Sequence, residues 1–415
     1  MLWCILGILL SPIALFLILT VLIYLPPIQN WAVDKVAAIA SEKSGMQISV
    51  GHVNLSFPLD LGIDRFRIVS QEDTIADVER LVVDVKFWPL LQKKVVISEL
   101  EVNNTRFNTN GFVEAAKVKG DFKKLSLSSK GIDLDKQTVE VNGTLLEEAH
   151  IDVALNDSVP KDTTKTETPW VIHVDKVTIE RSDVALHMPG DTTNITTHIG
   201  TLTAQEALID LKTETYTVGS VDWANGELTY DQKNQLPVAG LDVNHIQLTH
   251  INIGIDSIYF HDPTLRMHMR QMAMREKSGL QIAELSGPLS MENGSIKVPK
   301  LKIITPESDV AIELDMPLSL ADSIDPGKMR LKLEANIGKK DLMPFMAALP
   351  EAFRQSWPDR PMNVRGSVSG NMQHMDFKDL ELTLPQSVYL KATGFAANLN
   401  DPQHLLADVL FTANT

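Results

Sequence analysis

Hydrophobic and polar residues alternate with a period of two along most of the chain beyond residue 45. In the clearest run, 329–337, Met329, Leu331 and Leu333 alternate with charged or polar neighbours. Such alternation puts apolar side chains on one face of a sheet and polar side chains on the other. Antiparallel sheets tolerate one wet face, whereas parallel sheets buried on both faces do not show this pattern. The pattern therefore predicts a mainly β, largely antiparallel fold.

Turn residues and a loose repeat divide this β region. The dipeptides Asn225-Gly226 and Asn293-Gly294 are of the hairpin type, because both residue types accept positive φ. Paired short apolar runs begin at Val177, Leu301 and Leu380, and recurrent units of this kind are typical of a solenoid. The chain also ends within a predicted strand without a polar cap, so we expect a longer natural protein, truncated here at its C-terminal end.

Few helices are predicted outside the first 25 residues. Ile28, Ala32, Val36 and Ile39 recur at helical spacing, which predicts an amphipathic entry helix that ends near Gly45. A second helix is predicted within 339–357, where Pro350 should break or kink it, and where we expect a connector covering one patch of sheet. The stretch 156–169 lacks apolar anchors and predicts a flexible loop.

The first 25 residues contain no charged side chain and are long enough to cross a hydrocarbon core of roughly 30 Å. A cleaved signal peptide is the rival interpretation, but the apolar run is too long and no A-x-A-like site follows it. The segment therefore predicts an uncleaved transmembrane anchor. Its representative membrane residues are Trp3, Leu10, Phe16, Leu22 and Tyr24.

Composition and motifs exclude several classes of function. The chain carries 53 acidic against 38 basic residues, a net charge of -15. Nucleic-acid binders normally show a basic patch, so we expect no nucleic-acid partner. The phosphate-binding G-x-x-x-x-G-K-[ST] and G-x-G-x-x-G motifs and the zinc motif H-E-x-x-H do not occur, and we expect neither a cofactor nor enzymatic activity.

One cluster, Met267-His268-Met269, contains ligand types that bind copper(I). In a strand, however, alternation would put His268 on the face opposite both methionines. We therefore expect the methionines to fill an apolar face, and we expect no metal site.

Residues 27–107 resemble the N-terminal module of the AsmA/TamB family. The matching features are Pro27, Gln29 early in a helix, Gly45, the run 48–58 ending in Phe-Pro, and Asp-Thr-Ile at 73–75. Later segments, 365–370 with the strands of 380–394 and the Asn-Leu-Asn-Asp-Pro turn at 398–402, resemble the repeated unit of the same family.

The resemblance implies a bacterial inner-membrane protein with a single N-terminal anchor and its bulk in the periplasm. It implies an elongated β-taco whose apolar groove carries phospholipid between the inner and outer membranes. The alternative that it implies is a scaffold for assembly or translocation of outer-membrane β-barrel proteins, with an outer-membrane partner. The expected domains are an anchor, 1–25, an AsmA-like β module with its entry helix, 26–155, a flexible loop, 156–169, and a repetitive β-groove, 170–415.

The residues themselves are compatible with this function. An apolar sheet face must be covered, and the sequence offers too few helices to cover a long one. Either the sheet packs a dry core, or it curls into a groove that receives phospholipid acyl chains, and the sequence leaves both open. The candidate groove-lining residues are Val184, Leu186, Val310, Ile312, Leu331, Leu333, Leu382 and Leu390.

Overall fold

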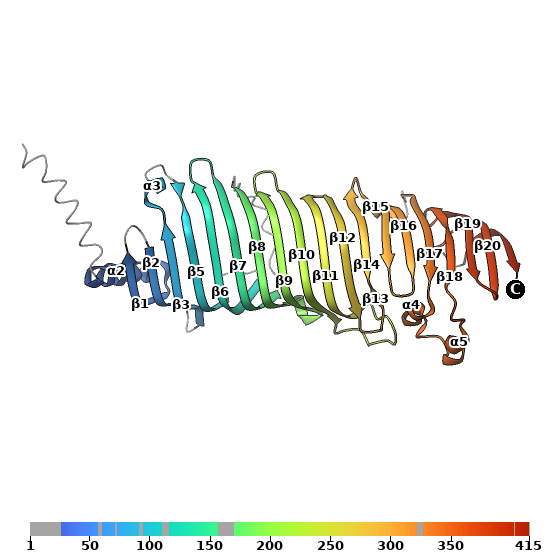
Figure 1. The fold of residues 1–415 in the computed structure, drawn as a ribbon, viewed down its shortest axis with the longest axis horizontal. Helices are drawn as coiled ribbons and strands as arrows, with labels where there is room; N and C mark the ends of the chain where they lie inside the picture. Colours follow the sequence, from blue (N-terminus) through green and yellow to red (C-terminus); the bar gives the residue numbers. More distant parts are fainter. Residues whose placement is uncertain are drawn as a thin grey trace, which may run out of the picture. The chain divides into compact units, whose positions relative to one another are not determined.

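A computed structural model describes residues 26–56, 60–70, 73–90, 94–109, 116–156, 170–321, 327–401 and 403–414. Strands make up most of these residues and short helices only a few (Figure 1). The predicted mainly β fold is therefore confirmed. The chain forms two compact units, Met1–Pro189 and Gly190–Thr415.

The first unit begins with a helix that leads into a series of bent strands. The strands pair in the order β1-β2-β3-β5-β6-β7-β8, and the short β4 also pairs with β6. The elements are α2 (Pro26–Ser44), β1 (Gln47–Ser56), β2 (Asp60–Ser70), β3 (Asp73–Val85), α3 (Phe87–Leu90), β4 (Lys94–Val95), β5 (Ile97–Asn108), β6 (Ala116–Asp133), β7 (Thr138–Leu155) and β8 (Val171–His187).

Strands β7 and β8 pair in parallel, with Thr138 opposite Val171 and Ala154 opposite His187. All other described strand pairs are antiparallel, so the predicted largely antiparallel sheet is confirmed with this one exception among them. A parallel pair requires a connection that returns along the length of the strand. The predicted flexible loop falls in this connection, and residues 157–169 lie outside the described residues.

The second unit continues as an antiparallel meander in which each strand pairs with the next, β12 pairing with both β13 and β14. After η1 (Pro189–Asp191), its elements are β9 (Thr193–Asp210), β10 (Thr215–Gln232), β11 (His245–His261), β12 (Thr264–Glu276), β13 (Gln281–Ile282), β14 (Glu284–Glu292), β15 (Ser295–Ile304), β16 (Asp309–Pro317), η2 (Leu318–Ala321), β17 (Met329–Ile337), α4 (Lys339–Leu342), η3 (Met343–Met346), α5 (Glu351–Ser356), β18 (Met362–Gly370), β19 (His374–Leu384), β20 (Val388–Ala397) and β21 (Leu406–Asn414).

The helix predicted within 339–357 is broken into α4, η3 and α5, and Pro350 stands at the N-terminal cap of α5. The predicted break at this proline is confirmed, because its ring and missing N–H prevent the helix from continuing. Phe345 and Phe353 remain 62% and 48% exposed. The segment connects β17 to β18, but these two side chains do not cover the sheet.

In the first unit, pairing skips a position at the same level of each strand except the two-residue β4. On β2, for example, Phe66 and Asp64 have partners on β1 and Arg65 between them has none, and the register is the same on both sides of the skip. We call the skipped residues the crease row, and four of them have positive φ, which turns the strand. The crease row consists of Gly51, Arg65, Glu79, Asn104, Lys123, Glu148 and Arg181.

The crease keeps apolar side chains on one face through the bend. On β3, Val78 and Leu81 lie on either side of Glu79, so the apolar spacing changes there from two residues to three. Val78 and Ala149, beside the crease row, are only 7% and 0% exposed. They are buried although their main neighbours are the adjacent strands of the same sheet. This face therefore lies on the inside of the bend, and we call it the inner face; the opposite face is the outer face.

Strands of the second unit bend at similar skips in pairing. Asn225 and His250 have φ of 54° and 55° within β10 and β11, and Ile251 is only 1% exposed. The hairpin predicted at Asn225-Gly226 is therefore wrong, because the dipeptide lies inside β10. Asn tolerates positive φ equally well at a bulge and at a turn. The turn predicted at Asn293-Gly294 is confirmed between β14 and β15.

The bend of β18 generates a prediction for Gly366, whose φ is 150°. A Cβ there would lie 2.7 Å from Leu380 Cδ2 and 2.8 Å from Leu380 Cα. We expect Gly366→Ala to lower the free energy of unfolding by about 1–3 kcal/mol, through backbone strain, in urea titrations of the full chain. Ser367→Ala, on the next residue, should stay within about 0.5 kcal/mol. Equal stability of the two variants would contradict a strained bend at this position.

Candidate functional site

Apolar side chains of the second unit form cross-strand rows on the inner face. Pairing places Val310 opposite Ala335, Ile312 opposite Leu333, and Leu314 opposite Leu331. One such row crosses the six strands β15 to β20. It consists of Ile303, Val310, Ala335, Val364, Leu382 and Leu390.

The structure brings together the six candidate lining residues of the second unit. They lie in adjacent cross-strand positions on β16, β17, β19 and β20: Val310, Ile312, Leu331, Leu333, Leu382 and Leu390. Val184 and Leu186 lie in the first unit on β8, opposite Ile151 and Val153 of β7. All eight therefore occupy apolar cross-strand rows, and their contact with lipid remains a prediction.

The side chains of these rows are only partly buried. Leu390 is 38% exposed, and the other seven candidates are half-buried. Isolated side chains such as Ala335, 8% exposed, are buried between their neighbours. A dry core encloses its side chains completely, and most side chains of these rows are not enclosed in this way.

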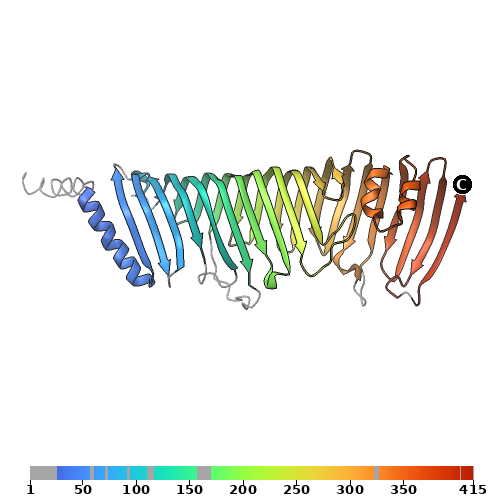
Figure 2. The ribbon, with the colours of Figure 1, turned by 90° about the horizontal axis from the view of Figure 1, so that it is seen from below.

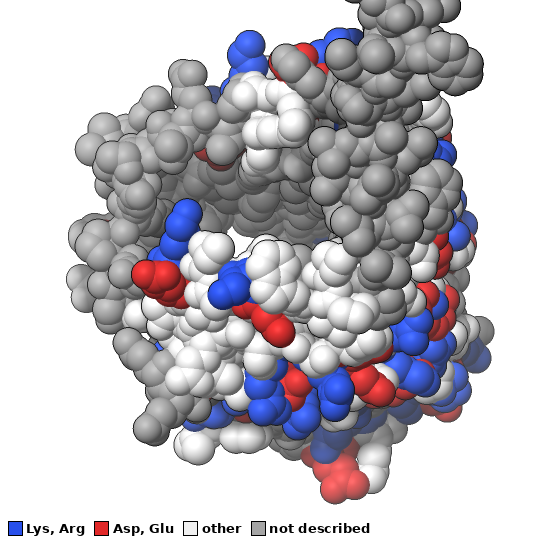
Figure 3. Space-filling view, turned by 90° about the vertical axis from the view of Figure 1, so that its left-hand side faces the viewer, with Lys and Arg blue, Asp and Glu red and all other residues white. Residues whose placement is uncertain are grey.

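The outer face carries charge pairs. Lys332 Nζ lies 3.2 Å from Glu313 Oε1 and 3.5 Å from Glu334 Oε1, all on well-exposed side chains. The hydrogen bond to Glu313 raises the pKa of Lys332. Figure 3 shows the N-terminal end of the molecule, where Lys, Arg, Asp and Glu side chains of the described residues gather on one side of the surface. The two faces of the sheet therefore differ sharply in polarity.

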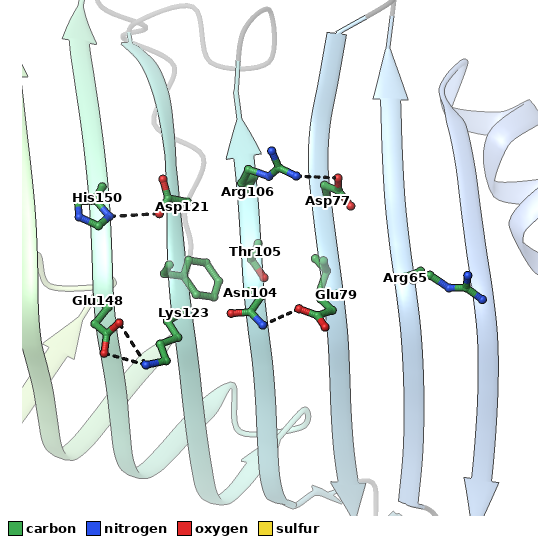
Figure 4. A pocket seen from close by; sticks show the side chains of 12 residues that line it. Arg65, Asp77, Glu79, Asn104, Thr105, Arg106, Asp121, Lys123, Glu148 and His150 are labelled. Carbon is green, nitrogen blue, oxygen red and sulfur yellow. Dashed lines mark hydrogen bonds and ion pairs between the residues drawn. The ribbon is translucent and has the colours of Figure 1, made fainter.

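A shallow depression of about 620 Å³ lies on the outer face of the first unit, along the crease row (Figure 4). Asn104 Nδ2 donates to Glu79 Oε2 at 2.5 Å, and Lys123 Nζ donates to Glu148 Oε1 at 3.0 Å. The hydrogen bond from Lys123 holds the pKa of Glu148 below its usual value. Because these groups satisfy one another in the open, we interpret the depression as a solvated ladder of charge pairs and not as a ligand site.

The described residues offer no group of three or more His, Cys, Asp or Glu side chains that could hold a metal ion. On β12, His268 is exposed while Met267 and Met269 are half-buried. This is the arrangement that strand alternation predicts, with imidazole and thioethers on opposite faces.

Helix α2 covers the free edge of β1 (Figure 2). Gln29 is 6% exposed, and its Nε2 donates to Leu55 O at 2.8 Å while its Oε1 accepts from Leu55 N at 3.0 Å. Ser41 Oγ accepts from Ile48 N at 2.9 Å. Polar side chains of the helix thus replace the backbone partners that an edge strand lacks.

The apolar stripe predicted to bury α2 is not its contact face. Val36 and Ile39 are 65% and 53% exposed, whereas Gln29 is buried. The orientation of the helix follows the backbone of β1, because Gln29 and Ser41 both hydrogen-bond to that strand. In the sequence, Gln29 stands out only through the resemblance to the AsmA/TamB family. Its position in the helix does not indicate that it binds the backbone of β1.

No described helix is both long and apolar enough to cross a membrane. The predicted anchor, residues 1–25 with Trp3, Leu10, Phe16, Leu22 and Tyr24, lies outside the described residues. It therefore stays a prediction.

Comparison with known proteins yields no family: no protein-family model matches the chain, and no curated protein sequence matches it.

The Gln29 clamp generates a prediction. We expect Gln29→Leu to lower the free energy of unfolding by about 1–3 kcal/mol, because it leaves two half-buried backbone groups of Leu55 without partners. Hydrogen exchange of the Leu55 amide should also become faster. Glu42→Gln, on the exposed side of the same helix, should change neither measurement. Unchanged protection of Leu55 in the Gln29 variant would show that the clamp does not hold the edge.

A charge cluster at Glu381 predicts a pH dependence. Lys391 Nζ donates to Glu381 Oε1 at 3.1 Å, and Arg365 Nε donates to Oε2 at 2.6 Å. The bond from Lys391, followed by that from Arg365, lowers the pKa of Glu381 from 4.5. A carboxyl whose folded pKa is lowered stabilises the fold above its unfolded pKa, and this contribution is lost as the pH falls through the folded pKa.

We therefore expect Glu381→Gln to flatten the loss of stability on acidification below about pH 4.5. The measurement is urea unfolding across that range. Lys391→Met should act in the same direction and non-additively with Glu381→Gln, since the two groups share one interaction. Lys378→Met, at an exposed lysine of the same sheet, should leave the profile unchanged. An unaltered profile in Glu381→Gln contradicts the assignment.

Proposed function

We propose that this chain is a membrane-anchored groove protein of the bacterial periplasm, which shields phospholipid acyl chains as they pass between the inner and outer membranes. The proposal joins the resemblance to the AsmA/TamB family with the half-buried apolar rows on the inner face. The observation that carries it is that Leu331, Leu333 and Leu382 share one apolar face and are only half-buried there.

Acyl chains suit such a surface energetically. Burial of each CH₂ group contributes about 0.8 kcal/mol and has no directional requirement. A chain of many CH₂ groups is therefore held firmly in total, while each step along the surface exchanges one aliphatic neighbour for another. A row of Val, Ile and Leu side chains provides adhesion without a fixed binding pose, which is what a conduit requires.

The dimensions also fit. Neighbouring strands lie about 4.8 Å apart, so a row that crosses β15 to β20 extends roughly 24 Å. One acyl chain spans about half of a hydrocarbon core of roughly 30 Å. The row is thus longer than one acyl chain, and successive rows lie side by side on the same face.

The lipid proposal is tested by photo-cross-linking in cells grown with radioactive phosphate. A benzophenone amino acid is placed at Leu331 or Leu333 of the full chain, and as controls at Lys332 or Glu334 of the same strand. We expect labelled phospholipid on the chain from the inner-face positions only, because the alternating residues face opposite sides. Equal labelling from both faces, or labelling from neither, contradicts the proposal.

A matched pair of variants tests whether the rows carry the lipid. Leu333→Asp puts a charge on the apolar face, where it is costly beside acyl chains, and should reduce copurifying phospholipid severalfold. Lys332→Asp puts the same residue on the outer face and should retain the lipid. Lipid is measured by native mass spectrometry on chains shown by circular dichroism to be folded.

A further inference from the structure

The exposed side of α2 combines apolar and basic side chains in one face. Trp31, Val36 and Ile39 are 63%, 65% and 53% exposed, and Lys35 and Lys43 are exposed as well. With 3.6 residues per turn, Trp31, Lys35 and Ile39 follow one another at intervals of four, and Val36 and Lys43 lie beside them. Glu42 also lies on this face, between the positions of Trp31 and Lys35, and Asp34 points away from it.

The fold fixes the direction of this face. Gln29 and Ser41 bind the backbone of β1, so the opposite side of α2 has to point away from the sheet. Ile39 cannot rotate toward the sheet without breaking those bonds, and Val36, two turns after Gln29, borders the contact but is itself 65% exposed. The apolar face is therefore held outward by the polar contacts of the helix.

The chain itself indicates what meets this face. The 25 residues before Pro26 contain no charged side chain, so α2 begins where the predicted anchor leaves the membrane. Trp with flanking Lys is the composition of a helix that lies in the interface, where the indole ring sits at headgroup level and lysine reaches the phosphates.

We propose that α2 lies flat on the inner-membrane surface, with Trp31, Val36 and Ile39 inserted among the lipid headgroups, and that it thereby holds the β1 end of the sheet against the bilayer. This inference rests on the proposed function, and it deepens it by naming where acyl chains enter. The hydrogen-bonded contact between α2 and β1 places the first strand of the apolar inner face within reach of the lipid surface.

The test uses the full chain with Cys4→Ser, in vesicles of phosphatidylethanolamine and phosphatidylglycerol. Single nitroxide labels are attached at Val36→Cys, Ile39→Cys and the control Asp34→Cys, and the accessibility of each to oxygen and to a water-soluble nickel complex is compared. We expect the labels at 36 and 39 to lie about 5–10 Å below the headgroup boundary and the label at 34 to be in water.

Two results would overturn the inference. One is equal nickel accessibility at positions 34, 36 and 39 while the chain remains in the membrane fraction. The other is strong dipolar broadening between labels at position 36, which would show that a second copy covers the face.

A loading experiment separates this inference from the proposed function. Trp31→Ser/Val36→Ser/Ile39→Ser should reduce lipid cross-linking at Leu331 severalfold in membranes, yet bind lipid normally when phospholipid is supplied in detergent. If the triple variant is cross-linked to lipid normally in membranes, the role of α2 is overturned and the proposed function is not. If the unmodified chain binds lipid neither in membranes nor in detergent, the proposed function itself is overturned.

Discussion

Backbone pairing between neighbouring strands is the constraint on which the rest of this structure depends. Side chains alternate strictly along a strand, so a shift of one residue in any strand would move its aliphatic side chains to the wet face. The strands nevertheless bend. They do so without mixing the faces because pairing skips a position at the same level of each strand of the first unit except β4, from Gly51 on β1 to Arg181 on β8. A bend shared by all neighbours preserves register, whereas a bend in one strand alone would break it.

The energetic consequences differ between the two faces. The charge pairs of the outer face are well exposed, and pairs of this kind contribute little to stability. The inner face contributes through cross-strand contacts within the aliphatic rows, where Leu331, Leu333 and Leu382 are only half-buried. Apolar surface therefore remains available on the inner face. The same feature that limits the stability of the bare sheet gives acyl chains a surface to bury.

The edge of β1 shows how one local contact links the sheet to its proposed surroundings. Gln29 supplies a donor and an acceptor to Leu55 and so substitutes for a missing strand. This protects the edge from pairing with another chain. It also turns Trp31, Val36 and Ile39 outward. In this way a hydrogen-bonding requirement of the sheet creates the apolar surface that we assign to the membrane.

The sequence by itself determined which segments are strands, which side chains share a face, and where Pro350 and Asn293-Gly294 interrupt them, because these depend on neighbours a few residues away. At each bend, successive inward-facing residues are three positions apart instead of two, as Val102 and Thr105 are. In the sequence alone, this spacing looks the same as a turn between two strands. Only the pairing of a neighbouring strand on both sides shows that the strand continues. Only the tertiary structure decided that Asn225-Gly226 is a bulge, that β7 and β8 run in parallel, and that α2 meets β1 through Gln29. Those outcomes depend on backbone groups of other strands, whose need for hydrogen-bond partners no local pattern of side chains records.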